Sequence, residues 1–218
     1  MNMNDIVAEV RHLIQDTDEV AYRYTDENII KYVNHTLKRM CIMRPDLFAY
    51  VAEIPTVAGQ VLQSAPADSV RIMDIFNVVG GDGIIETEKT GLDQTYPQWM
   101  NDPAGPCINW MRHGRNANKF FIYPKAPVGQ VLYGEYAQSP RMYVAGEDIE
   151  LLTDVYFPAV VDGTVYLAQS IDDEHVISQR AQMFMQSFMQ TLGASVQARE
   201  LSDTDNPNAS VTEGVVRE

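Results

Sequence analysis

The sequence has only two cysteines, no apolar run of membrane-spanning length and no recognisable catalytic motif. Cys41 and Cys107 form neither a CxxC pair nor the dense framework that staples small secreted domains, so we expect two buried free thiols. No stretch approaches the ~18 to 20 uncharged apolar residues that cross a bilayer, and the opening MNMNDIVAEVRHLIQDTDE is too acidic and interrupted for a signal peptide. These absences predict a soluble protein that is made in the cytoplasm and has no membrane partner.

Nucleotide, hydrolase and metal-site signatures are missing as well. The GGDG at residues 80–83 has neither GxGxxG spacing nor a GK[ST] ending, and no GxSxG occurs. The four histidines are scattered and form no HExxH. Asp203 and Asp205 lack the glycine and the final glutamate of a calcium loop. We therefore expect no enzyme activity, no cofactor and no bound metal.

Charge is unevenly distributed along the chain, whose formal net charge is -14. Residues 146–218 carry 13 acidic side chains against three arginines, whereas residues 101–145 carry five basic and two acidic side chains. Affinity for duplex DNA comes largely from Lys and Arg side chains that displace counterions from phosphates. The acidity therefore argues against tight DNA binding and is compatible with a surface that DNA slides past.

Helical patterns occupy both ends of the chain. The spacing predicts a helix behind Asn4 as N-cap, and a second helix that begins after Thr25 and is stopped by Pro45. Residues 154–171 predict a buried helix with a kink or a late start. A long helix follows Asp172 or Asp173, with one apolar stripe of Ile177, Ala181, Phe184, Phe188 and Leu192.

Between these ends, short runs rich in Val, Ile, Phe and Tyr alternate with Pro and Gly. Six runs read as strands, and a short helix near GLDQTYPQW interrupts them. The predicted fold class is α+β: residues 1–49 and 146–200 form a four-helix bundle, and residues 50–145 form an inserted small antiparallel β-sandwich or barrel. Residues 201–218 have lost the apolar stripe and predict a flexible tail.

The stretch NWMRHGRNANKFFIYPKAP, residues 109–127, combines basic and aromatic side chains without an acid. Such a mixture can hold single-stranded nucleic acid by stacking and charge. Alternation along the FFIY segment and the hydrophilic RNANK loop favour instead a hairpin whose turn is basic. Under the hairpin interpretation the turn residues are solvated; the basic side chains of the stretch are Arg112, Arg115, Lys119 and Lys125.

The order of several segments resembles a known family. TDENIIKYVNHTLKRMCIMRPDLF, LQSAP, RIMDIFNV, YPQW, KFFIYPKAPVGQVLYGEYAQSP and LLTDVYFPAVVDGTVYLAQSIDDEH follow one another as in the head-to-tail adaptor (connector) proteins of tailed bacteriophages, especially those with short tails. The resemblance extends from about residue 5 to residue 195 and depends on the ordered set of segments, since no single motif is diagnostic.

The resemblance implies a structural virion protein, assembled in the host cytoplasm at the head–tail interface. It implies a homo-oligomeric ring, about twelve-fold, that docks under the portal protein of the DNA-filled capsid, offers a platform to the tail nozzle and tail fibre proteins, and lets dsDNA pass transiently. The basic turn, with Arg112, Arg115 and Lys119, would then be a rim of the β domain that meets an acidic tail partner rather than DNA. The portal-binding segment carried over from the family would include Arg199, Leu201, Val211, Val215 and Val216.

A second function class remains open, a binding module that recognises a carbohydrate or another host-surface ligand. Tyr96, Trp99 and Trp110 offer aromatic faces that could stack on a sugar, although Trp is equally common in a protein core.

Overall fold

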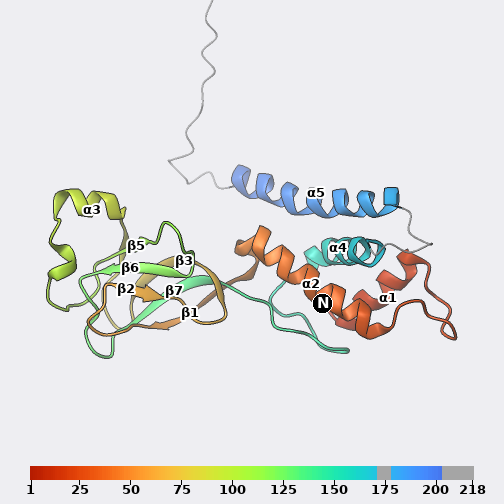
Figure 1. Cartoon of the computed structure of the whole chain (residues 1–218), viewed down its shortest axis with the longest axis horizontal. Helices are drawn as coiled ribbons and strands as arrows, with labels where there is room; N and C mark the ends of the chain where they lie inside the picture. Colours follow the sequence, from red (N-terminus) through yellow and green to blue (C-terminus); the bar gives the residue numbers. More distant parts are fainter. Residues whose placement is uncertain (171–177, 203–218) are drawn as a thin grey trace, which may run out of the picture.

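The computed structural model describes residues 1–170 and 178–202. The molecule is elongated, with most of its helices gathered at one end and the strands, together with one short helix, at the other (Figure 1). The expected α+β class is confirmed: five α-helices and two β-sheets form in the described part of the chain.

The first two helices begin at side-chain caps. Helix α1, Met3–Ile14, is capped by Asn2, whose side chain accepts a hydrogen bond from the Asn4 N–H at 2.9 Å. The prediction of Asn4 as the cap is therefore wrong by two residues, and the Asn4 side chain instead accepts from the Gly146 N–H at 2.9 Å. Helix α2, Asp26–Met43, is capped by Thr25 and ends before Pro45, as predicted.

The C-terminal helices are α4, Phe157–Gln169, and α5, Ser178–Ser202, with the 3-10 turn η3, Asp154–Tyr156, before them. Pro158 lies in the first turn of α4, which confirms the late start. Gly163 allows close packing, since a Cβ there would lie 2.6 Å from Thr36 and 3.0 Å from Phe188. The expected cap at Asp172 or Asp173, and Ile177 of the stripe, lie outside the described residues.

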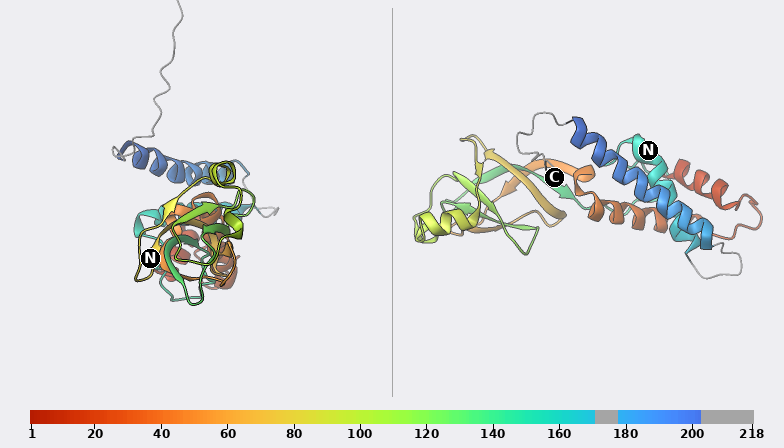
Figure 2. Two further views of the ribbon diagram at one scale, coloured as in Figure 1. Left: turned by 90° about the vertical axis from the view of Figure 1, so that its left-hand side faces the viewer. Right: turned by 90° about the horizontal axis from the view of Figure 1, so that it is seen from above.

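One apolar core joins α1, α2, α4 and α5 with the segment that follows the last strand. Asn34 fixes that segment: its amide donates to the Tyr143 carbonyl at 2.9 Å, and its Oδ1 accepts from the Tyr143 N–H at 2.8 Å. Figures 1 and 2 show α5 running back along α4, with its C-terminal end directed toward the strands. The main members of the core are Met3, Ile6, Val10, Ile29, Val33, Leu37, Val160, Val165, Phe188 and Leu192.

The strands form a three-stranded and a four-stranded sheet. The first has the order β1 (Ala49–Pro55), β7 (Val131–Gln138), β3 (Ser69–Val78). The second has the order β2 (Leu62–Ser64), β6 (Lys119–Tyr123), β5 (Asn109–Arg112), β4 (Ile85–Glu86). A second core, which contains Ile75, Trp110, Phe120 and Leu132, involves both sheets.

The structure refines the predicted β region in two respects. All six predicted runs form strands, but β4 was missed, and it pairs in parallel with β5, so the region is not wholly antiparallel. Within the described residues the two sheets stay separate, so they do not close into a barrel. A strand of two residues carries too few side chains to show an alternating pattern.

Short helices complete the β region. Helix α3, Lys89–Thr95, and the 3-10 turn η2, Trp99–Asn101, confirm the helix expected near GLDQTYPQW, and η1, Pro45–Phe48, links α2 to β1. The Trp99 ring lies 6.2 Å from the rings of both Phe121 and Tyr123, so this excursion covers the outer face of β6. None of the helices in the described ranges is long and apolar enough to cross a membrane.

Candidate functional site

The basic stretch folds as an antiparallel hairpin of β5 and β6, with Asn109 opposite Tyr123 and Arg112 opposite Phe120. Phe120 and Ile122 are buried, whereas Phe121 and Tyr123 are half-buried on the other face. The structure therefore confirms the hairpin with a basic turn.

Hydrogen bonds fix the shape of the turn, residues 113–118. The Nδ1 atom of His113 accepts from the N–H groups of Arg115 at 3.2 Å and Asn116 at 3.1 Å. Because Nδ1 accepts, the neutral ring carries its proton on Nε2. The same ring stacks on Phe121, with centroids 5.5 Å apart. The His113 side chain thus helps to fix the backbone of the turn that carries Arg115.

The turn is also attached to the start of β3. The Asn118 amide donates to the Ser69 carbonyl at 2.6 Å, and the Ile72 N–H donates to the Ala117 carbonyl at 3.0 Å. Between the turn and the strand lies an open hollow of about 270 Å³. We call this the basic hollow; its lining residues are Arg71, Ile72, Arg112, His113, Gly114, Arg115, Asn116, Ala117 and Lys119.

Arg112 is tied into the wall of the basic hollow. Its Nε lies 2.6 Å from Oε1 of Glu86, and its terminal nitrogens donate to the carbonyls of Ile72 at 3.3 Å and Met73 at 2.5 Å. The guanidinium also lies 4.8 Å from the centroid of the Trp110 ring. Arg112 therefore joins β5 to β3 and β4, and its charge is already compensated.

The other three cations of the basic hollow are uncompensated. Among the described residues, no carboxylate lies within ion-pairing distance of Arg71, Arg115 or Lys119. Arg71 and Arg115 are exposed and Lys119 is half-buried. Around one concavity lie three positive charges that have no ionic partner in the described part of the chain, and such an arrangement is chemically suited to an anionic group.

Sequence analysis found Arg112, Arg115 and Lys119 but missed Arg71. The first three come from one hairpin, whereas Arg71 reaches the hollow only through the pairing of β3 beside the turn. Nothing in the local pattern around Arg71 distinguishes it from any exposed strand residue.

The basic hollow lies at the end of the β region that joins the helices. Ser69, which bonds to the turn, pairs with Gln138, where β7 leaves the sheet, and β1 enters at the same end. The opposite end consists of turns that carry exposed Val57, Val79, Ile108 and Val128, around a hollow of about 340 Å³ lined by residues 78–83 and 106–108.

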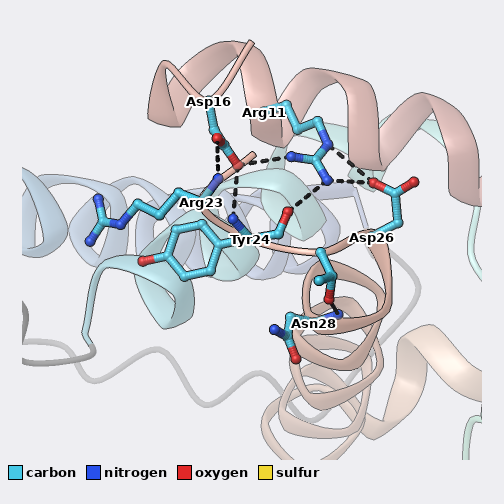
Figure 3. A network of polar contacts seen from close by, with 7 residues as sticks. Arg11, Asp16, Arg23, Tyr24, Asp26 and Asn28 are labelled. Atoms are coloured by element: carbon cyan, nitrogen blue, oxygen red, sulfur yellow. Dashed lines mark hydrogen bonds and ion pairs between the residues drawn. The ribbon is translucent and has the colours of Figure 1, made fainter. Parts of the chain in front are cut away.

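A buried arginine, Arg11, serves the fold. Arg11, 6% exposed, donates to Oδ2 of Asp16 at 2.8 Å, to the Tyr24 carbonyl at 2.8 Å and to Oδ1 of Asp26 (Figure 3). Asp16 also accepts from the N–H groups of Arg23 at 2.8 Å and Tyr24 at 3.1 Å. This network links the end of α1 to the start of α2, and its two buried charges, Arg11 and Asp16, are paired with each other.

The residues assigned to portal binding lie mostly beyond the described part of the chain. Arg199 and Leu201 belong to α5, which continues to Ser202 and so extends two residues into the predicted tail. Val211, Val215 and Val216 lie outside the described residues. Their role stays a prediction.

The aromatic residues suggested for sugar stacking are mostly inaccessible. Trp99 is 1% exposed and Trp110 is fully buried, so the suggestion is wrong for both. Tyr96 is exposed, and its hydroxyl donates to Oδ1 of Asp102 at 2.7 Å. A stacking platform of several rings is therefore not available at these positions.

The two cysteines are free and buried, as predicted. Burial raises the pKa of Cys41 to about 11 and that of Cys107 to about 12, so both stay protonated and unreactive at neutral pH. In the part of the chain that the structure describes, no three His, Cys, Asp or Glu side chains converge to hold a metal ion.

Comparison with protein families gives a match over nearly the whole chain. A family model described as SU10 adaptor protein matches residues 1–211. No curated protein matches the chain.

Proposed function

We propose, from the premise that this chain belongs to the SU10 adaptor protein family and is a phage head-to-tail adaptor, that it forms the ring joining the portal to the tail nozzle and fibres. The single observation that carries the proposal is the family match over residues 1–211. The ordered segments of the sequence indicated the same family. The ring would contain about twelve copies, joined by contacts between two different faces of each subunit.

The portal would be held by the C-terminal segment. Arg199 and Leu201 at the end of α5 would begin the contact, and Val211, Val215 and Val216 would supply its apolar anchors. One such segment offers little apolar surface, so affinity would come from many copies that bind one ring of portal clefts at once.

The acidity of the chain suits passage of DNA through the ring. A net charge of -14 per subunit, repeated around a channel, repels a polyanion from every side. Screening limits this repulsion to about 8 to 10 Å in physiological salt, so it acts on DNA that approaches the wall. The duplex would therefore leave the capsid without adhering.

The basic hollow would bind carboxylates of a protein partner rather than DNA. Its cations converge on a concavity of about 270 Å³, which fits side chains, whereas a duplex needs an extended track of cations along its phosphates. In a head-to-tail adaptor, an acidic tail component is the expected partner for Arg112, Arg115 and Lys119.

Sedimentation velocity of the chain, alone and mixed with portal rings from the same genome, tests this function. We expect the free chain to move onto the portal at one subunit per portal subunit. A chain that ends at Ser202 keeps α5 and should not move. If the full chain does not co-sediment, portal docking is refuted; if the shortened chain binds equally well, the role of the C-terminal segment is refuted.

A further inference from the structure

We propose that the basic hollow is a binding site for an acidic peptide, and that residues 203–218 of the same chain occupy it before assembly. These residues contain Asp203, Asp205, Glu213 and Glu218 against a single arginine, so the net negative charge of the segment is opposite to the positive charge of the hollow. The contact is a property of the isolated chain. Its consequence for assembly rests on the proposed function.

The position of α5 brings this segment to the hollow. Figures 1 and 2 show the C-terminal end of α5, drawn in dark blue, beside the β region rather than at the far end of the helices. The basic hollow lies at the end of the β region that joins the helices. An extended chain covers about 3.3 to 3.6 Å per residue, so the segment after Ser202 spans roughly 50 Å when fully extended.

The chemistry of the hollow favours carboxylates. Arg71 and Arg115 present planar guanidinium groups, which can pair with both oxygens of a carboxylate, and Lys119 adds a point charge. All three lack an ionic partner among the described residues. The hydrogen-bonded His113 turn holds the backbone of Arg115 in a defined frame, which lowers the entropic cost of binding.

Because the segment belongs to the same chain as the hollow, a contact of low intrinsic affinity is enough to keep the hollow occupied. A segment joined to the same chain is present at an effective concentration in the millimolar range, so it outcompetes a free ligand of similar charge. Because the ion pairs are near the surface, salt should release the segment.

The contact would set an order of assembly. When portal clefts take the C-terminal segment, the hollow is vacated, and the carboxylates of a tail partner can enter. Portal binding and tail binding both require the internal contact between the C-terminal segment and the hollow to break. Each event therefore strengthens the other, because thermodynamic linkage is reciprocal. A free subunit would bind the tail partner poorly until it has docked.

A labelled peptide of residues 203–218 tests the site by fluorescence anisotropy. We expect the chain that ends at Ser202 to bind the peptide and the full chain to bind it at least tenfold more weakly, because its own segment fills the hollow. Arg115→Glu with Lys119→Glu in the shortened chain should abolish binding. Lys31→Glu with Lys38→Glu is the matched control, since both lysines are exposed on α2 and the change in net charge is the same.

Several results would overturn the proposal. Equal peptide binding by the shortened and full chains would show that the segment does not fill its own hollow, and inhibition that appears only at high protein concentration would assign the occupant to a second copy. Equal losses in the two double variants would mean general charge attraction. Tighter binding of a DNA oligonucleotide, lost in the hollow variant alone, would assign the site to nucleic acid. Portal co-sedimentation is scored separately, so either proposal can fail while the other stands.

Discussion

The chain contains a buried arginine, Arg11, and a basic hollow, and the two differ in what surrounds their positive charge. Arg11 is buried, and two carboxylates and a backbone carbonyl accept its hydrogen bonds. The basic hollow is open, and Arg71, Arg115 and Lys119 have no carboxylate partner among the described residues. Arg11 connects two helices of the fold, whereas the three cations of the hollow could still pair with the carboxylates of a partner.

The difference separates structural charge from charge available for binding. A buried charge costs much free energy unless it is paired, so the partners of Arg11 are part of the fold. An exposed cation contributes little to stability whether or not it is paired, so leaving it free costs the fold almost nothing. Arg112 falls between the two, since it is paired with Glu86 but lines the hollow.

The largest effect is expected at Arg11. Arg11→Ala leaves Asp16 buried without its cation, and loss of one partner of a buried ion pair costs about 3 to 5 kcal/mol. Urea unfolding followed by circular dichroism measures this change, with Lys31→Ala on the surface of α2 as the control. A cost similar to that of the control would show that the network does not stabilise the fold.

A smaller loss of stability is expected when Asn34 is replaced, because its side chain forms buried hydrogen bonds that involve no charge. Asn34→Ala leaves the N–H and carbonyl of Tyr143 without partners in the interior, at a cost of about 2 to 3 kcal/mol. Hydrogen exchange at the Tyr143 amide should accelerate together with the drop in unfolding free energy. Unchanged exchange at that amide would contradict the assigned contact.

Replacement of Arg112 should lower the unfolding free energy by less than the changes at Arg11 and Asn34. Arg112→Ala removes an exposed ion pair, two bonds to carbonyls and a contact with Trp110, which together should cost about 1 to 2 kcal/mol. Arg112→Lys should restore only part of the stability because an ammonium cannot reproduce the guanidinium fork. If Arg112→Ala leaves the urea midpoint unchanged, Arg112 belongs with the free cations of the hollow.

Local signals explain what the sequence could predict. The helix after Thr25, its end before Pro45 and the six longer strands depend on caps, proline and side-chain alternation, all of which are visible in a short window. The hairpin of residues 109–123 followed from the same alternation. Asn2 and Asn4 both suit an N-cap, and only the contact of Asn4 with Gly146 decides between them.

Features that depend on distant pairing were not predictable. Arg71 joins the hollow through the position of β3 beside the turn, and Glu86 neutralises Arg112 from a strand too short to recognise. The burial of Trp99 likewise requires the excursion of α3 and η2 to fold back onto β6. The sequence therefore identified three of the four basic residues of the site, but neither Arg71 nor the pairing of Arg112 with Glu86.

The smallest stability change, and the sharpest test of the comparison, is expected for Arg115→Ala with Lys119→Ala. Because neither side chain has an ionic partner within residues 1–170 and 178–202, we expect the unfolding free energy of the chain that ends at Ser202 to change by no more than about 0.5 kcal/mol. Binding of the acidic peptide by the chain that ends at Ser202 should nevertheless fall strongly, and the remaining affinity should depend less on salt, since fewer ion pairs are screened. Urea unfolding and peptide anisotropy on the same preparation give both values. A loss of stability that accompanies the loss of binding would mean that these cations support the turn. The distinction between Arg11 as a structural charge and the basic hollow as a binding site would then fail.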